Sequence, residues 1–67
     1  MITITDIQEG AKFKTSTGII WIIDSIEENT KHGTLVNTSM ANGSKGNYVD
    51  SINEVVSFLN EENAVKL

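Results

Sequence analysis

The 67-residue sequence contains no cysteine, no proline and no arginine, and each absence narrows what the protein can be. Without cysteine the chain forms neither disulfides nor thiolate metal ligands, and a small domain without such cross-links fits a reducing compartment. We therefore expect a cytoplasmic protein, located in the host cytoplasm if a phage encodes it. A chain rich in Ile, Asn and Lys but free of Arg and Pro is typical of the AT-rich genomes of many bacteria and phages.

Long apolar runs are missing as well. No window approaches the roughly 18 apolar residues of a membrane-spanning helix. Residues 1–10 also lack the basic and apolar regions of a signal peptide. The sequence therefore predicts no membrane partner.

Positive charge is scarce: the chain has five lysines and nine Asp and Glu residues, which gives a formal net charge of -4. Nucleic-acid binding needs a field of basic charge, and phosphates and guanines are recognised mainly by guanidinium groups, which this chain lacks. The alternative function is nevertheless a small-barrel nucleic-acid-binding protein that uses Lys12, Lys14 and Lys45 beside an exposed Trp21. Nucleic acid is thus the less favoured partner.

The short length predicts a single domain over residues 1–67 with a thin core. Chains of this size bury only about 60% of the surface that the unfolded chain exposes. Almost every large apolar side chain must therefore contribute to the core or to a contact with another molecule.

The spacing of apolar residues predicts an antiparallel sheet of 4–5 strands. Alternating or β-branched residues mark the segments 1–5, 11–15, 19–27, 34–40 and 48–49. Turns rich in polar residues and glycine connect the later segments, at 16–18, 27–33 and 41–47.

A C-terminal amphipathic helix is predicted from residue 52 to residue 60 or 62. Ser51 precedes it and Glu54 follows three residues later, which is the spacing of a capping box. One apolar stripe runs along this helix: Ile52, Val55, Val56 and Leu59. Asn60 and Asn63 are the candidate C-cap residues.

The segment "GIIWIID" at residues 18–24 is unusual because both of its faces are apolar. By strand alternation Ile20, Ile22 and Ile26 point to one side, and Trp21 and Ile23 point to the other. A strand that is apolar on both faces is normally covered on both. We expect one face to lie inside a curved sheet and the other under the helix or a second copy of the chain.

These segments predict a mostly β protein of the α+β class with one C-terminal helix. The number of strands and the short turn in "TSTGIIWII" are similar, in a general way, to small SH3-like barrels. A strongly curved antiparallel sheet is the other form that the sequence allows.

No pattern indicates catalysis, a metal or a cofactor. His32 is the only histidine, so neither a metal site nor a serine nucleophile with its base can be built around it. The neighbouring carboxylates at 27–28 and 61–62 point in different directions and do not form an acid–base pair. We expect a protein that is not an enzyme and that binds neither a metal nor a cofactor.

Surplus apolar residues indicate a contact with another protein. Trp21 is favoured as a core residue, although its ring also suits a partner, and Phe58 widens the apolar face of the helix. The candidate interface residues are Trp21, Ile23, Phe58, Val65 and Leu67. The leading hypothesis is a small non-catalytic protein-interaction module of a bacterial or phage accessory or inhibitor type. It binds a protein partner or associates with itself as a homo-oligomer.

Overall fold

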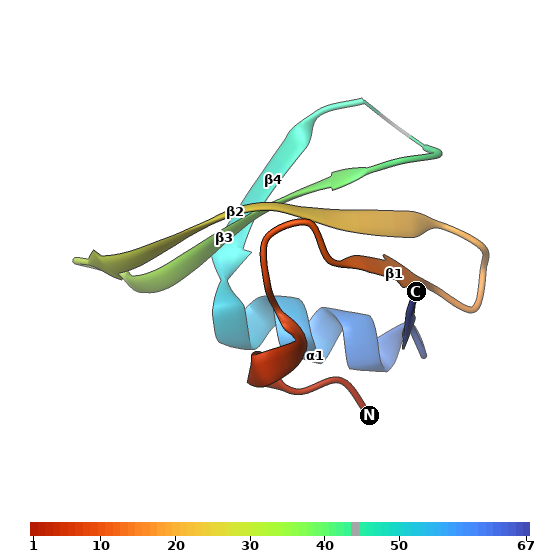
Figure 1. Cartoon of the computed structure of the whole chain (residues 1–67), viewed down its shortest axis with the longest axis horizontal. Coiled ribbons are helices and arrows are strands. Elements are labelled where there is room, and N and C mark those ends of the chain that lie inside the picture. Colours follow the sequence, from red (N-terminus) through yellow and green to blue (C-terminus); the bar gives the residue numbers. More distant parts are fainter. Residues whose placement is uncertain (44) are drawn as a thin grey trace.

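The computed structural model describes residues 1–43 and 45–67, and Figure 1 shows how they are arranged. A short 3-10 helix, η1 (Ile4–Asp6), precedes the strands β1 (Lys12–Lys14), β2 (Ile20–Thr30), β3 (Gly33–Met40) and β4 (Asn47–Ser51). The chain then continues through the α-helix α1 (Ile52–Glu61) and the short strand β5 (Val65–Lys66). Ser44, within the predicted turn at 41–47, lies outside the described residues.

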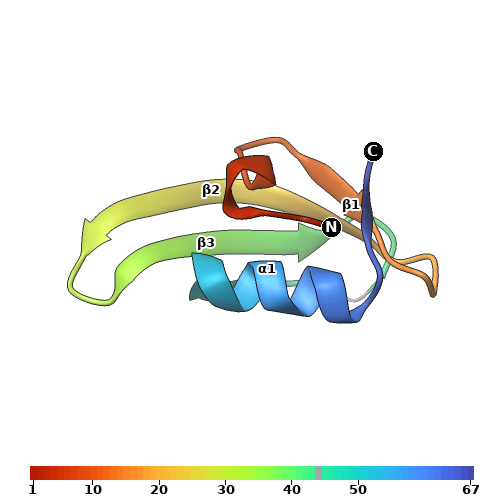
Figure 2. The same ribbon diagram turned by 90° about the horizontal axis from the view of Figure 1, so that it is seen from below.

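The strands form one antiparallel sheet in the order β4-β3-β2-β1-β5, and α1 lies across one of its faces (Figure 2). Among the described residues α1 is the only α-helix, so the predicted mostly β, α+β class is confirmed. The sheet is open, with β4 and β5 at its two edges, and does not close into a barrel. The similarity to SH3-like barrels stays a prediction.

The prediction of an N-terminal strand is wrong, because local hydrogen bonds form η1 instead. The Asp6 N–H donates to the Thr3 carbonyl over 3.0 Å, and Asp6 Oδ2 accepts the Thr3 N–H over 2.9 Å. The bond from the Thr3 backbone is the main reason why the pKa of Asp6 lies below its usual value. Ile2 and Ile7 are buried while Ile4 is exposed, so the alternation in this segment does not mark a sheet face.

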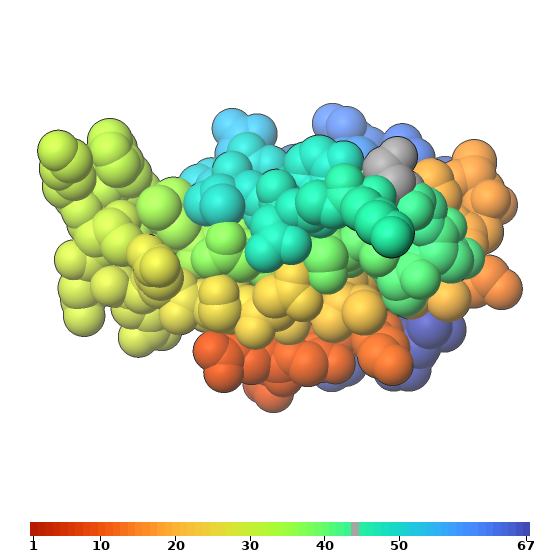
Figure 3. All heavy atoms as spheres, turned by 90° about the horizontal axis from the view of Figure 1, so that it is seen from above, coloured from red at the N-terminus to blue at the C-terminus, as the bar shows by residue number. Residues whose placement is uncertain are grey.

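The helix covers one face of the apolar segment in β2. Trp21 pairs with the fully buried Phe13 of β1, and Ile23 is itself buried. By strand alternation Ile20 and Ile22 lie on the other face. Figure 3 views the molecule from above and shows no helix over this face. These two side chains are half-buried and pair with the lysines of β1. The expected cover on the second face is therefore not supplied by the described residues.

A β-bulge changes the direction of the side chains farther along β2. The pairing with β3 shifts after Ile23, so Asp24 is an extra residue. Ile26 consequently pairs with the buried Val36 and packs against the core. An extra residue reverses the alternation of side chains. The prediction that Ile26 shares the face of Ile20 and Ile22, opposite the helix, is therefore wrong.

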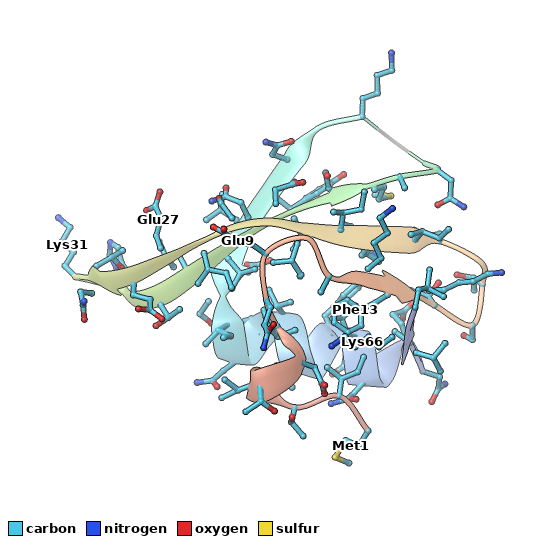
Figure 4. All side chains as sticks on the ribbon, viewed as in Figure 1. Met1, Glu9, Phe13, Glu27, Lys31 and Lys66 are labelled. Atoms are coloured by element: carbon cyan, nitrogen blue, oxygen red, sulfur yellow. The ribbon has the colours of Figure 1, made fainter. Side chains whose placement is uncertain are left out.

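The hairpin between β2 and β3 is longer than the sequence predicts. The expected turn at 27–33 shrinks to Lys31 and His32, because β2 continues to Thr30. Glu27 still pairs with a residue of β3. Figure 4 shows Lys31 at the tip of this hairpin, which projects beyond the helix. Polar residues can extend the strands there because the projecting part has no apolar layer to face.

The helix α1 starts where the sequence predicts, but only one of the two predicted capping-box hydrogen bonds forms. Among the described residues, the Glu54 carboxylate accepts no hydrogen bond from the Ser51 N–H. Ser51 Oγ accepts the Glu54 N–H over 3.3 Å, which confirms Ser51 as the N-cap. Val55 and Leu59 of the predicted stripe are buried against the sheet. Since Ser51 also ends β4, no loop separates the strand from the helix.

Asn60 connects the end of the helix to the N-terminal segment. The C-cap is Glu62, and Asn63 follows it with a left-handed φ of 52°. The Asn63 N–H donates to the Asn60 carbonyl over 3.1 Å and the Ala64 N–H donates to the Leu59 carbonyl over 2.9 Å, so Asn63 ends the helix as its predicted role requires. Asn60 does not have the predicted capping role. The Asn60 side chain instead accepts the Ile2 N–H over 2.8 Å and donates to the Ile2 carbonyl over 2.9 Å. The Asn60 amide thereby makes the two hydrogen bonds that a neighbouring strand would make to Ile2. These bonds fix the position of Ile2, whose side chain is buried in the core.

The core lies between α1 and the covered face of the sheet. Its buried apolar residues come from η1 and its flanks, the central strands and the helix: Ile2, Ile7, Phe13, Ile23, Val36, Val55 and Leu59. Figure 4 shows Phe13 between β1 and α1. Because so few side chains are fully buried, each contributes a large share of the stability.

The residues after α1 form an edge strand. β5 pairs with β1, and the Leu67 N–H donates to the Lys12 carbonyl over 2.9 Å. The side chains of Val65 and Leu67 nevertheless remain exposed. The C-terminal residues therefore belong to the sheet through their backbone rather than through their side chains.

We expect Ser51→Ala to lower the free energy of unfolding by about 1 kcal/mol, because it removes the side-chain acceptor at the start of α1. Urea denaturation followed by circular dichroism measures this change. Ser57 is exposed on the same helix, so Ser57→Ala is the control and should leave stability nearly unchanged. Equal losses in both variants would contradict the capping role.

Candidate functional site

The candidate site is an apolar pocket between α1 and the sheet, on the side of β4. Its volume is about 260 Å³. Three strands and the helix line it with the side chains of Trp21, Ile23, Thr38, Met40, Tyr48, Asp50, Val55, Phe58 and Leu59. A concave, mainly apolar surface with a few polar groups is typical of binding sites in proteins.

Three aromatic rings frame this pocket. The ring of Trp21 meets those of Tyr48 and Phe58 edge to face, with centroid distances of 5.4 and 5.5 Å. Such distances are typical of favourable aromatic pairs. Trp21 is partly buried, whereas Tyr48 is 42% exposed and Phe58 is 41% exposed. The rings therefore hold one another in place and still present apolar surface to a ligand.

The indole N–H of Trp21 is buried and has no acceptor among the described residues. A buried donor without a partner costs about 1–3 kcal/mol. Trp21 is also the only tryptophan of the chain, so its fluorescence reports on the pocket directly.

Asp50 supplies a negative charge to the lining of the pocket, where no other charged side chain is found among the described residues. It pairs with the buried Val36, so its side chain projects on the helix side of the sheet. A carboxylate beside an apolar pocket favours a ligand that combines an apolar group with a positive charge.

β4 is an outer edge of the sheet next to this pocket. It pairs with β3 on one side only. Within the described part of the chain, no backbone hydrogen bond from outside the sheet reaches residues 47–51. Unpaired N–H and C=O groups along such an edge form a template for a further strand.

The structure brings some of the predicted interface residues together and separates others. Trp21, Ile23 and Phe58 line the same pocket. Val65 and Leu67 lie at the opposite edge of the sheet, next to β1. The five candidates therefore do not form one surface.

The lining also includes three residues that the sequence does not mark as site residues: Met40, Tyr48 and Asp50. Tyr48 belongs to a predicted strand, but its position depends on the register between β3 and β4, where it pairs with Thr38. One signal was available in the sequence. The predicted helix starts directly after the strand that carries Tyr48. The helix must therefore pack close to this strand, and one face of the strand then lies near the helix.

The lysines of the nucleic-acid hypothesis do not share a face with Trp21. Lys12 and Lys14 pair with Ile22 and Ile20, which lie on the face of the sheet opposite the helix. Trp21 lies on the helix side. Lys45 is exposed in the segment before β4. The combination of lysines with a stacking tryptophan on one surface is therefore not assembled.

A second and more polar hollow of about 610 Å³ lies between the β2–β3 hairpin, η1 and the start of α1, and His32 and Glu28 belong to its lining. In residues 1–43 and 45–67, no group of three or more His, Asp or Glu side chains gathers as metal ligands would. Within the same residues, no helix has the length and apolar character that crossing a bilayer requires.

Comparison of the chain with protein-family models, curated proteins and solved structures found no match. The geometry and chemistry of the pocket are therefore the basis for proposing a function.

Proposed function

We propose that this protein is a small non-catalytic protein-interaction module, in which the pocket framed by Trp21, Tyr48 and Phe58 receives an apolar side chain of a partner protein. The half-exposed aromatic rings around an apolar pocket are the observation that carries this proposal. Aromatic residues are enriched in the centres of protein interfaces, and a few such residues usually supply most of the binding energy.

The size of the pocket supports a side chain as its occupant. Sites for small molecules and cofactors usually measure about 300–1,000 Å³. The pocket here measures about 260 Å³, which is below that range. It suits one large side chain with some neighbouring backbone better than an entire cofactor.

The charged group of the pocket also fits a polypeptide. Asp50 can pair with a basic side chain of the partner. Apolar contact and a positive charge can both be supplied by one peptide segment.

Selection from a phage-displayed library of short random peptides tests this function. We expect peptides that bind the protein and change the fluorescence of Trp21 on titration. Phe58→Ala should raise the dissociation constant of these peptides by about tenfold or more, because it removes one wall of the pocket.

Leu67→Ala is the matched control, since Leu67 is also exposed but lies at the opposite edge of the sheet. It should leave the dissociation constant unchanged. Failure to select any peptide, or peptides that bind the Phe58→Ala variant as well as the parent protein, would overturn the proposed function.

A further inference from the structure

We infer that the partner segment binds as an additional β-strand on the free edge of β4, with a basic side chain facing Asp50 and an apolar side chain entering the pocket. This inference rests on the proposed function and adds the conformation and the chemistry of the partner. It depends on three features that meet at one place: the edge of β4, the register of its side chains, and the charge of Asp50.

The free edge of β4 supplies the backbone interactions. Each strand has hydrogen-bonding groups along both sides, and those of β4 that point away from β3 receive no backbone hydrogen bond from other described elements. An extended peptide that pairs with this edge gains a ladder of main-chain hydrogen bonds, which is a recurring mode of peptide recognition. The backbone then supplies affinity that does not depend on sequence.

The register of β4 places the pocket beside an added strand. Tyr48 and Asp50 pair with Thr38 and Val36, two buried residues on the helix side of β3. Side chains on paired strands share a face, so residues of the added strand opposite Tyr48 and Asp50 also project toward the helix side. These two residues of the partner lie two positions apart. The one opposite Tyr48 is the one that reaches the aromatic pocket.

The charge of the site determines the second side chain. Asp50 is the charged side chain of the described lining, and the chain as a whole has a formal net charge of -4. Opposite charges on directly paired strand residues stabilise a sheet, whereas like charges destabilise it. The partner should therefore carry Lys or Arg opposite Asp50 and a large apolar residue two positions away.

Charge also favours a foreign segment over a second copy of the chain. Two copies of β4 that pair antiparallel about Val49 would place Asp50 of each copy opposite Tyr48 of the other. No basic residue of β4 would then face either carboxylate, and two acidic chains would approach each other. A basic, extended segment of another protein satisfies the site better.

Peptides obtained by the display selection test the binding mode. We expect enrichment of a basic residue two positions from a large apolar residue. Replacing the backbone amides by N-methyl amides one at a time removes a donor at each position. Methylation at alternate positions should weaken binding by about tenfold or more, because only every second amide points to β4, and methylation at the positions between should have little effect.

Variants at Asp50 test the charge. Asp50→Asn should weaken binding several-fold and reduce its dependence on salt, whereas Glu54→Gln, an exposed carboxylate on α1, should not. Asp50→Lys should prefer a peptide in which the basic residue is replaced by Glu. This reversal of preference does not occur if Asp50 only affects folding.

The outcomes separate this inference from the proposed function. Peptides that need Phe58 but tolerate methylation at every position, or that bind as helices, would overturn strand addition and leave the interaction module intact. Binding that does not change with Asp50→Asn would overturn the charge assignment. A dimer found by light scattering, and dissociated by the selected peptides, would show that a second copy occupies the edge of β4 instead.

Discussion

Val55→Asp is expected to abolish cooperative folding of this domain at ambient temperature. Val55 is 7% exposed and packs between α1 and the sheet, so its replacement would bury a carboxylate without a counter-charge. Such burial costs several kcal/mol, and a domain of 67 residues has a total stability of about 3–10 kcal/mol. Asp50 lines the same pocket and would add repulsion between like charges.

The loss of dispersed signals in a proton–nitrogen NMR spectrum, together with the loss of a cooperative thermal transition, measures this unfolding. Ser57→Asp is the control, because Ser57 is exposed on the same helix. This variant introduces the same residue, so the added charge and the low helix propensity of aspartate are matched. We expect Ser57→Asp to change stability by no more than about 0.5 kcal/mol. A cooperative melt of Val55→Asp at the parent temperature would refute the placement of α1.

The sequence predicts the elements whose signals are local. The helix is the clearest example, since the Ser51 cap and the apolar spacing that includes Val55 and Leu59 lie within a few residues of one another. The turn at 16–18 is similar, because Gly18 has a positive φ of 91° that glycine adopts readily. In both cases the chain needs no distant partner to choose its conformation.

The elements that depend on distant partners were predicted poorly. Ile2 alternates with polar residues as in a strand, but its backbone bonds go to the Asn60 side chain, far away in the sequence. No glycine or proline next to Asp24 indicates the bulge in the sequence. The bulge follows from the pairing of β2 with β3. Because the bulge decides which face Ile26 occupies, a local pattern assigned that residue to the wrong face.

The candidate site was predicted in part for the same reason. Two large apolar residues are recognisable in the sequence as candidates: Trp21, in a strand that is apolar on both faces, and Phe58, which lies beside the apolar stripe of the helix. Both line the pocket. Tyr48 and Asp50 enter the site only through the register of β4, which no local pattern specifies. The sequence also groups Val65 with Trp21 and Phe58 because it is apolar, although the sheet order places Val65 at the far edge.

Phe13→Ala is expected to lower the free energy of unfolding by about 3–5 kcal/mol, the cost of a cavity left by a buried phenylalanine. Phe13 is 0% exposed, and its strand pairs with β2 at Trp21 and with β5 at Lys66. The loss is comparable with the entire stability expected of so small a domain. Thermal unfolding should therefore occur close to ambient temperature, or the variant should be unfolded throughout.

Phe58→Ala provides the comparison, because Phe13 and Phe58 are the only phenylalanines of the chain. Phe58 is 41% exposed and touches Trp21 on one side, so its removal should cost only about 1–2 kcal/mol and leave the domain folded. Equal losses in the two variants would make Phe58 a core residue and would weaken the case for a binding pocket. A small loss of stability combined with a large loss of peptide binding would mean that the exposed ring contributes to recognition more than to folding.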